Sequence, residues 1–280
     1  MSIFETLNET PVTNLDLTRF VTVSRDTSIA DTVEAMTDQG ESCACVLDGD
    51  ALVGIFTQRD ALRVVGRPSA WSRPISDEMT PLVKTIDAQQ TVADGLAIMT
   101  DWWVRSVPVL EAGKLVGNLS FYTIMRLIAE GVRSRATDDK GIRLGFSLMD
   151  FTGFSLSAPV TVRPDDTVDV AVHQMRARAI GSVLVVDERE SLIGLVTEYD
   201  ALTRLGCRVE DLSTVTIADV MTPDPVAVTA RSPLADAIVS MAEKGYSHVP
   251  ILGETGRPVG VASFRDLATY FETMLAALAP

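Results

Sequence analysis

A seven-residue phrase occurs four times along this chain and restricts its possible folds more than any other feature. Its copies read GIFTQRD, GNLSFYT, GLVTEYD and GVASFRD, at 54–60, 117–123, 194–200 and 260–266. A short β-branched stretch, an amphipathic helix pattern and an apolar strand pattern precede each copy, and a second helix pattern follows it. The sequence therefore predicts an α/β (α+β) protein of four strand-helix-strand-strand-helix (βαββα) repeats.

The predicted repeats should pair, because about 60 residues on their own leave too much apolar surface exposed. They cover about 15–66, 76–132, 148–206 and 215–275. The longest step between phrases is the middle one, and it contains a polar segment punctuated by glycine. We therefore expect a first pair in residues 1–132, a linker at 133–147 and a second pair in residues 148–280.

Composition argues against several classes of partner. Acidic residues outnumber basic ones by 38 to 24, and the net charge of -14 repels the phosphates of nucleic acids and anionic lipids. No apolar run approaches the roughly 18 residues that a membrane-spanning helix needs, and the N-terminus does not resemble a secretory leader. The three cysteines do not form a disulfide framework. We expect a cytoplasmic protein that binds neither nucleic acid nor membranes.

The phrase itself has two interpretations. Thr57 with Asp60 and Thr197 with Asp200 have the spacing of a helix capping box, which is a purely structural role. The same spacing also suits a nucleotide. A hydroxyl beside free backbone amides at a helix start attracts anions, and a carboxylate one turn later can accept hydrogen bonds from both hydroxyls of a ribose. Spacing alone leaves both interpretations open.

The repeated pattern resembles the cystathionine β-synthase (CBS) domain. The resemblance covers almost the whole chain and depends on the phrase, on MTPLV at 79–83 and MTPDPV at 221–226, and on Val107–Pro108 and Val249–Pro250. Two tandem pairs of such repeats resemble the nucleotide-sensing gamma subunit of AMP-activated protein kinase. The resemblance implies two pseudo-symmetric pairs of the Bateman type, with adenine nucleotides bound in clefts between paired repeats.

The resemblance also implies roles for individual residues. The ribose carboxylates would be Asp60, Asp200 and Asp266, and the hydroxyls near ribose or phosphate would be Thr57, Thr197, Ser263 and Ser120. The strand that enters a repeat would contact the base through Thr80, Pro81, Leu82, Val83, Pro223, Asp224 and Pro225. Phosphate contacts would come from Arg105 and His248, with Arg59 and Arg265 as further candidates.

The second repeat departs from this pattern, because Thr123 stands where the other phrases have aspartate. A threonine cannot accept two charge-assisted hydrogen bonds from a ribose, and such bonds contribute about 1.5–3 kcal/mol each. We expect this site to be empty, weak or adapted to another ligand.

These observations favour a non-catalytic, cytoplasmic sensor with AMP, ADP, ATP or S-adenosylmethionine as its regulatory ligand, which would make it a candidate for energy sensing. By resemblance it would form a homodimer or bind another protein partner. One alternative is a scaffold that binds no nucleotide and uses the phrases only as capping boxes. Another is a redox or metal-dependent enzyme at Cys43 and Cys45, although that pair lacks further ligands at metal-like spacing and better fits buried small residues. We expect no catalytic or metal-binding residues.

Overall fold

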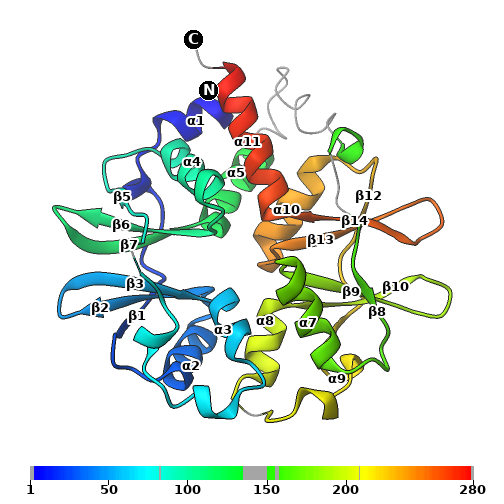
Figure 1. Cartoon of the computed structure of the whole chain (residues 1–280). Helices are drawn as coiled ribbons and strands as arrows, with labels where there is room; N and C mark the ends of the chain where they lie inside the picture. Colours follow the sequence, from blue (N-terminus) through cyan, green and yellow to red (C-terminus); the bar gives the residue numbers. More distant parts are fainter. Residues whose placement is uncertain (1–2, 82, 135–149, 155–157, 208, 279–280) are drawn as a thin grey trace. The chain divides into compact units, whose positions relative to one another are not determined.

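The computed structural model describes residues 3–81, 83–134, 150–154, 158–207 and 209–278 (Figure 1). Over these residues the chain folds into four βαββα repeats, each with its own sheet, as the sequence predicted. Most of the predicted linker at 133–147 lies outside the described residues, which stop at Ser134 and resume at Asp150.

Local signals in the sequence set the ends of the elements. In repeat 1, Ser28 caps the first helix by accepting a hydrogen bond from Asp31 N at 3.0 Å, and Gly40 ends it with φ 67°. The elements of repeat 1 are β1 (Val21–Ser24), α2 (Ile29–Gln39), β2 (Cys43–Asp48), β3 (Ala51–Thr57) and α3 (Gln58–Val64).

The other repeats have the same order of elements. Repeat 2 consists of β5 (Ile86–Asp87), α4 (Val92–Trp102), β6 (Ser106–Glu111), β7 (Lys114–Ser120) and α5 (Phe121–Ser134). Repeat 3 consists of β8 (Thr161–Val162), α7 (Val168–Arg178), β9 (Ser182–Val186), β10 (Leu192–Thr197) and α8 (Glu198–Asp200), which continues as the π-helical turn η6 (Ala201–Leu205). Repeat 4 consists of β12 (Val228–Thr229), α10 (Leu234–Lys244), β13 (His248–Leu252), β14 (Pro258–Ser263) and α11 (Phe264–Leu278).

Shorter elements connect the repeats. They are α1 (Ile3–Glu9), η1 (Val12–Asn14), η2 (Pro68–Ala70), η3 (Ile75–Asp77), β4 (Thr80–Pro81), η5 (Phe151–Gly153), η7 (Leu212–Thr214), α9 (Ile217–Val220) and β11 (Thr222–Pro223).

Strand pairing follows one scheme in all four sheets. The first strand of each repeat runs parallel to the second, and the second is antiparallel to the third. Two sheets gain a fourth strand from the segment that leads into the next repeat: β4 pairs with β3, and β11 pairs with β10. The MTP motifs therefore lie at the edge of the sheets of repeats 1 and 3, beside the phrases of those repeats.

The chain divides into two compact units that do not follow the sequence order of the repeats. One unit contains repeats 2 and 4, from Met1–Thr18, Lys84–Ala158 and Val226–Pro280, and we call it the 2/4 unit. The other contains repeats 1 and 3, from Arg19–Val83 and Pro159–Pro225, and we call it the 1/3 unit. Each unit has one hydrophobic core. The division into consecutive pairs at 1–132 and 148–280 stays a prediction, and each compact unit takes one repeat from each predicted pair.

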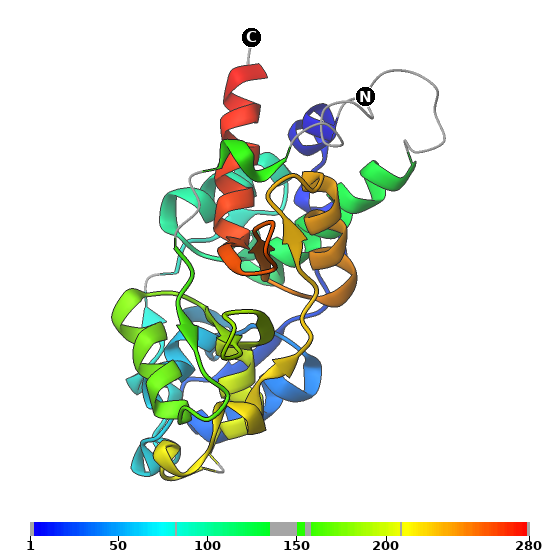
Figure 2. The same ribbon diagram turned by 90° about the vertical axis from the view of Figure 1, so that its right-hand side faces the viewer.

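Helices join the two repeats inside each unit. In the 2/4 unit, α5 packs against α10 and α4 against α11, and both views show α5 beside α10 (Figures 1 and 2). In the 1/3 unit, α3 contacts α7, α8 and η6. Arg176 of α7 closes the end of α3 by donating to the carbonyl oxygens of Leu62 and Val65. One methionine recurs in the first helix of each repeat and is buried in these cores: Met36, Met99, Met175 and Met241.

Candidate functional site

Each phrase spans the turn between the third strand of its repeat and the helix that follows. In repeat 1, the backbone amide and Oγ1 of Thr57 donate to Asp60 Oδ2 at 2.8 and 2.7 Å, while the Asp60 amide donates back to Thr57 Oγ1 at 3.4 Å. This is a complete capping box, and Asp60 is only 4% exposed. A nearly buried carboxylate is tolerated here because polar partners surround it.

Repeat 3 builds the same capping box, and repeat 4 has the same two hydrogen bonds to its carboxylate. Asp200 Oδ2 accepts from the Thr197 amide and Oγ1 at 2.9 and 2.6 Å, and Asp266 Oδ2 accepts from the Ser263 amide and Oγ at 2.7 and 2.6 Å. The capping-box interpretation is therefore correct for Thr57 with Asp60 and for Thr197 with Asp200, the two pairs for which the spacing predicted it. In all three phrases these hydrogen bonds end on Oδ2 of the aspartate. The contacts of the other carboxylate oxygen, Oδ1, differ between the phrases.

Repeat 2 keeps the turn but not the charge. Ser120 Oγ lies 2.9 Å from Thr123 Oγ1 and accepts from the Thr123 amide at 3.1 Å. The helix start is capped, but two hydroxyls replace the hydroxyl and carboxylate of the other phrases. The expectation that this site is weak or different stays a prediction.

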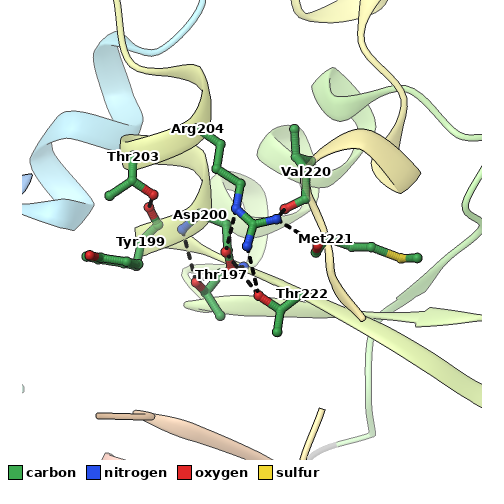
Figure 3. Close-up of polar contacts among 8 residues, drawn as sticks. All are labelled: Thr197, Tyr199, Asp200, Thr203, Arg204, Val220, Met221 and Thr222. Atoms are coloured by element: carbon green, nitrogen blue, oxygen red, sulfur yellow. Dashed lines mark hydrogen bonds and ion pairs between the residues drawn. The ribbon is translucent and has the colours of Figure 1, made fainter. Parts of the chain in front are cut away.

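In the 1/3 unit, Oδ1 of each aspartate faces an arginine of the same helix. Arg63 Nη2 lies 2.8 Å from Asp60 Oδ1 and also donates to the Glu78 carbonyl at 3.0 Å. In repeat 3, Arg204 Nε lies 3.4 Å from Asp200 Oδ1, and Thr222 Oγ1 donates to the same oxygen at 3.3 Å (Figure 3).

The predicted base contacts lie beside these carboxylates. Thr80 and Pro81 pair with Ile55 and Gly54, while Pro223 pairs with Gly194. Thr80, Pro81, Pro223 and Asp224 are exposed, and Val83 and Pro225 are half-buried. Leu82 lies outside the described residues. All the described members belong to the 1/3 unit, so they accompany the phrases of repeats 1 and 3.

The four candidate phosphate contacts have different surroundings. His248 is 8% exposed, and its Nδ1 lies 3.2 Å from Ser247 Oγ. The Arg105 guanidinium lies over the Phe264 ring, 5.6 Å from its centroid. Arg265 stacks on Trp103 at 4.2 Å, and Arg59 forms an ion pair with the buried Glu198 at 3.2 Å. Arg59 and Arg265 thus join the two repeats of their own units, and the phosphate role of all four stays a prediction.

Sequence reasoning missed three residues around the carboxylates: Arg63, Arg204 and Thr222. The arginines could have been found from helical spacing, because they stand three and four residues after Asp60 and Asp200 and so lie on the same helix face. Thr222 occupies the place in the second MTP motif that Thr80 has in the first. No sequence signal indicated that Thr222 donates a hydrogen bond to Asp200.

The thiols of β2 and the imidazole of His173 offer little chemistry. Cys43 and Cys45 are buried in β2, as predicted, and burial together with the neighbouring Cys43 raises the pKa of the Cys45 thiol well above its ordinary value. A thiol held protonated is a poor nucleophile and metal ligand. His173 is exposed on α7. Within the described ranges, no group of three or more His, Cys, Asp or Glu side chains could hold a metal ion.

Two further features concern the surface. Trp102 and Trp103 are more than half exposed at the end of α4, so neither packs in the core. Among the described helices, none combines the length and apolar character that spanning a bilayer requires.

Comparison with known proteins identifies the class. The CBS domain model matches residues 12–67, 75–130, 154–206 and 217–273, which are the four repeats of the structure. The chain therefore belongs to the CBS domain family. The predicted fold class, four CBS repeats in pairs, is confirmed.

Individual relatives support the family and the fold. A 17.7 kDa protein of Acidianus ambivalens is 32% identical over 38% of this chain and 63% of its own length. The CBS domain-containing protein CBSCBSPB3 of Arabidopsis thaliana is 24% identical over 89% of this chain and 50% of its own length. The chain thus spans less than two thirds of the length of each of these two relatives. A crystal structure from Methanocaldococcus jannaschii, of a candidate archaeal homologue of g-AMPK, has a TM-score of 0.74 at 17% identity and covers 90% of this chain and 96% of that one.

Proposed function

We propose that this protein is a non-catalytic regulatory sensor that binds adenine nucleotides or adenosyl compounds at the phrases of its CBS repeats. The observation that carries the proposal is the carboxylate of Asp60, Asp200 and Asp266, fixed at a helix start through Oδ2 beside a hydroxyl. A carboxylate in this position can accept from the ribose hydroxyls through Oδ1, while the helix start favours phosphate. Resemblance to the CBS family supplies the adenine specificity.

Signalling would follow from a shift between conformations. A ligand that binds one arrangement of the repeats more tightly increases the population of that arrangement, and the partner that recognises it responds. That partner would be a second copy of the chain or another protein, in the cytoplasm.

A thermal-shift screen of the purified protein tests the proposal. The compounds are AMP, ADP, ATP, NAD and S-adenosylmethionine, with guanine nucleotides as controls. A ligand at about one hundred times its dissociation constant stabilises the folded state by roughly 2.7 kcal/mol, so the melting temperature should rise by several degrees. Replacing the aspartate of an occupied site by alanine should then weaken binding by roughly ten- to a hundredfold.

The alternative is an interaction scaffold without a nucleotide site, and the complete capping boxes favour it. It predicts that the Asp→Ala variants melt at lower temperature, because a lost cap costs about 1 kcal/mol. It also predicts no shift of wild-type protein with any adenine compound. If protein shown by mass analysis to retain no nucleotide gave that result, the scaffold would replace the sensor.

A further inference from the structure

The three candidate ribose carboxylates differ in what occupies their second oxygen. Oδ2 has the same hydroxyl and amide donors in all three phrases. Oδ1 is the oxygen that a ribose would use, since the capping box does not involve it. Arg63 occupies Oδ1 of Asp60, and Arg204 together with Thr222 occupies Oδ1 of Asp200.

Arg204 does more than neutralise Asp200. Its Nη1 donates to the carbonyl oxygens of Val220 and Met221 at 2.9 and 2.7 Å, and its Nη2 donates to Thr222 Oγ1 at 3.3 Å (Figure 3). One guanidinium thus joins the helix after the phrase to the MTP segment, which by resemblance to CBS domains would contact the base. Arg63 likewise joins its helix to the segment before the first MTP motif, through one hydrogen bond to the Glu78 carbonyl oxygen. A ribose that binds either aspartate through Oδ1 competes with the arginine for that oxygen.

Asp266 lacks this arginine. The residues three and four positions after it are Thr269 and Tyr270, so no cation of its own helix face can reach Oδ1. Within the described part of the chain, Asp266 has hydrogen bonds to Ser263 alone, both at Oδ2. Asp266 is also half-buried rather than nearly buried. Of the three carboxylates, it is the one that presents an oxygen to a ligand in this conformation.

Groups suited to phosphate surround the same helix start. The Phe264 amide donates to the Ser247 carbonyl at 3.1 Å, and His248 is the strand partner of Ser263, so Ser247 and His248 flank the first turn of α11. From repeat 2, the Arg105 guanidinium reaches the Phe264 ring. The hydroxyl, imidazole and guanidinium therefore gather where the helix dipole favours an anion.

In the part of the chain that the structure describes, repeat 2 has a buried, unpaired hydroxyl next to Arg105 in sequence. The Phe121 amide donates to the Arg105 carbonyl at 2.8 Å, and the rings of Phe121 and Phe264 are 5.4 Å apart. Next to Arg105, Ser106 is 7% exposed, and its Oγ has no hydrogen-bond partner among the described residues. An unsatisfied buried hydroxyl is costly, and a phosphate oxygen would satisfy it.

At the corresponding positions, the 1/3 unit lacks groups that suit a phosphate. The strand partners of Thr57 and Thr197 are Cys43 and Ser182, which carry no charge. The first helical residue of repeat 3 is Glu198, whose side chain is only 2% exposed and pairs with Arg59. A second negative charge from a phosphate would be unfavourable beside this carboxylate.

We infer that, in its resting conformation, the chain binds one nucleoside phosphate at Asp266 in the 2/4 unit. Arg105, Ser106, Ser247 and His248 bind its phosphate, while Arg63 and Arg204 keep the sites at Asp60 and Asp200 closed. This inference rests on the proposed function and specifies which site is occupied and the charge of its ligand.

Isothermal titration of the full chain with AMP and with adenosine tests the inference. We expect one AMP per chain, bound at least tenfold more tightly than adenosine. The Asp266→Asn variant keeps the shape of the cap and should lose at least tenfold in AMP affinity. Arg105→Gln, which does not touch the cap, should remove most of the difference between AMP and adenosine.

Opening the closed sites gives an independent test. Arg204→Gln and Arg63→Gln should each add a second, weaker adenosine site, which persists when Asp266→Asn is added. Arg178→Gln is the matched control, because Arg178 is an exposed arginine of the 1/3 unit that bonds to Gln174, and it should leave the stoichiometry at one. Melting temperatures of all variants confirm folding.

Three results would overturn the inference while leaving the sensor proposal intact: two or more AMP molecules per wild-type chain, equal affinity for AMP and adenosine, or undiminished AMP binding by Asp266→Asn. A fourth such result is binding of an adenine compound that is not a phosphate ester, with no binding of AMP. Failure of every adenine compound to bind would instead refute the sensor proposal itself.

Discussion

Single residues at equivalent positions give the two units different chemistry. The first helical residue after each phrase's hydroxyl is Phe121 or Phe264 in the 2/4 unit, where the two rings meet edge to face. In the 1/3 unit the same positions are Gln58 and Glu198, both less than 7% exposed. One unit thus joins its repeats through aromatic packing and the other through buried polar groups, although the four phrases look alike in sequence.

The ion pair between Arg59 and Glu198 should stabilise the 1/3 unit measurably. Arg59→Ala removes a charged partner from a glutamate whose side chain is 2% exposed, so we expect a loss of about 1–3 kcal/mol in the free energy of unfolding. Adding Glu198→Gln should recover part of that loss, because it removes the buried charge. Urea denaturation of the two single variants and the double variant measures this coupling.

Arg25→Ala is the matched control for this measurement. Arg25 pairs with Asp48 at 3.0 Å, but both side chains are about half exposed, so its loss should cost less than about 1 kcal/mol. An equal loss for Arg25→Ala and Arg59→Ala would show that the burial of Glu198 adds nothing.

At the level of elements, the glycines that open the first three phrases let a neighbouring segment approach the third strand. A Cβ on Gly54 would meet the side chain of Met79, and one on Gly194 would meet Met221 at 2.5 Å. On Gly117 it would lie 2.5 Å from Leu17 Cβ and 3.0 Å from the Leu17 carbonyl oxygen. At these three positions the glycine is therefore required by the close approach of another segment.

The type of obstacle predicts which glycine tolerates alanine. Gly117→Ala should destabilise the protein by about 1–3 kcal/mol, because the Cβ and backbone oxygen of Leu17 cannot rotate away. Gly54→Ala should cost less, because the thioether of Met79 is flexible and can move. Thermal melting of both variants side by side measures the difference. A larger loss for Gly54→Ala would mean that the position of Met79 is more tightly constrained than that of Leu17.

At the level of the molecule, sequence patterns predicted the repeats and their elements well, but they did not predict which repeats pack together. The repeats follow from the recurrence of one phrase and its flanking patterns, and the capping boxes of repeats 1 and 3 follow from a spacing of three residues. Both agree with the structure. The partner of each repeat does not follow from spacing, because any two amphipathic faces of similar composition can pack together. For the same reason the sequence could not place Arg204 against Val220 or bury Glu198, whose neighbours come from distant segments.

Cutting the chain between the predicted pairs tests how far the two cores bind its halves together. Residues 1–140 and 141–280 would each carry half of the 2/4 core and half of the 1/3 core. Each fragment alone should therefore expose apolar helix faces and aggregate or self-associate. Co-expressed, the two should copurify as a 1:1 complex that melts cooperatively, which light scattering after size-exclusion chromatography and thermal melting can measure. Two monomeric fragments that each fold cooperatively would instead establish the consecutive pairs as the independent domains.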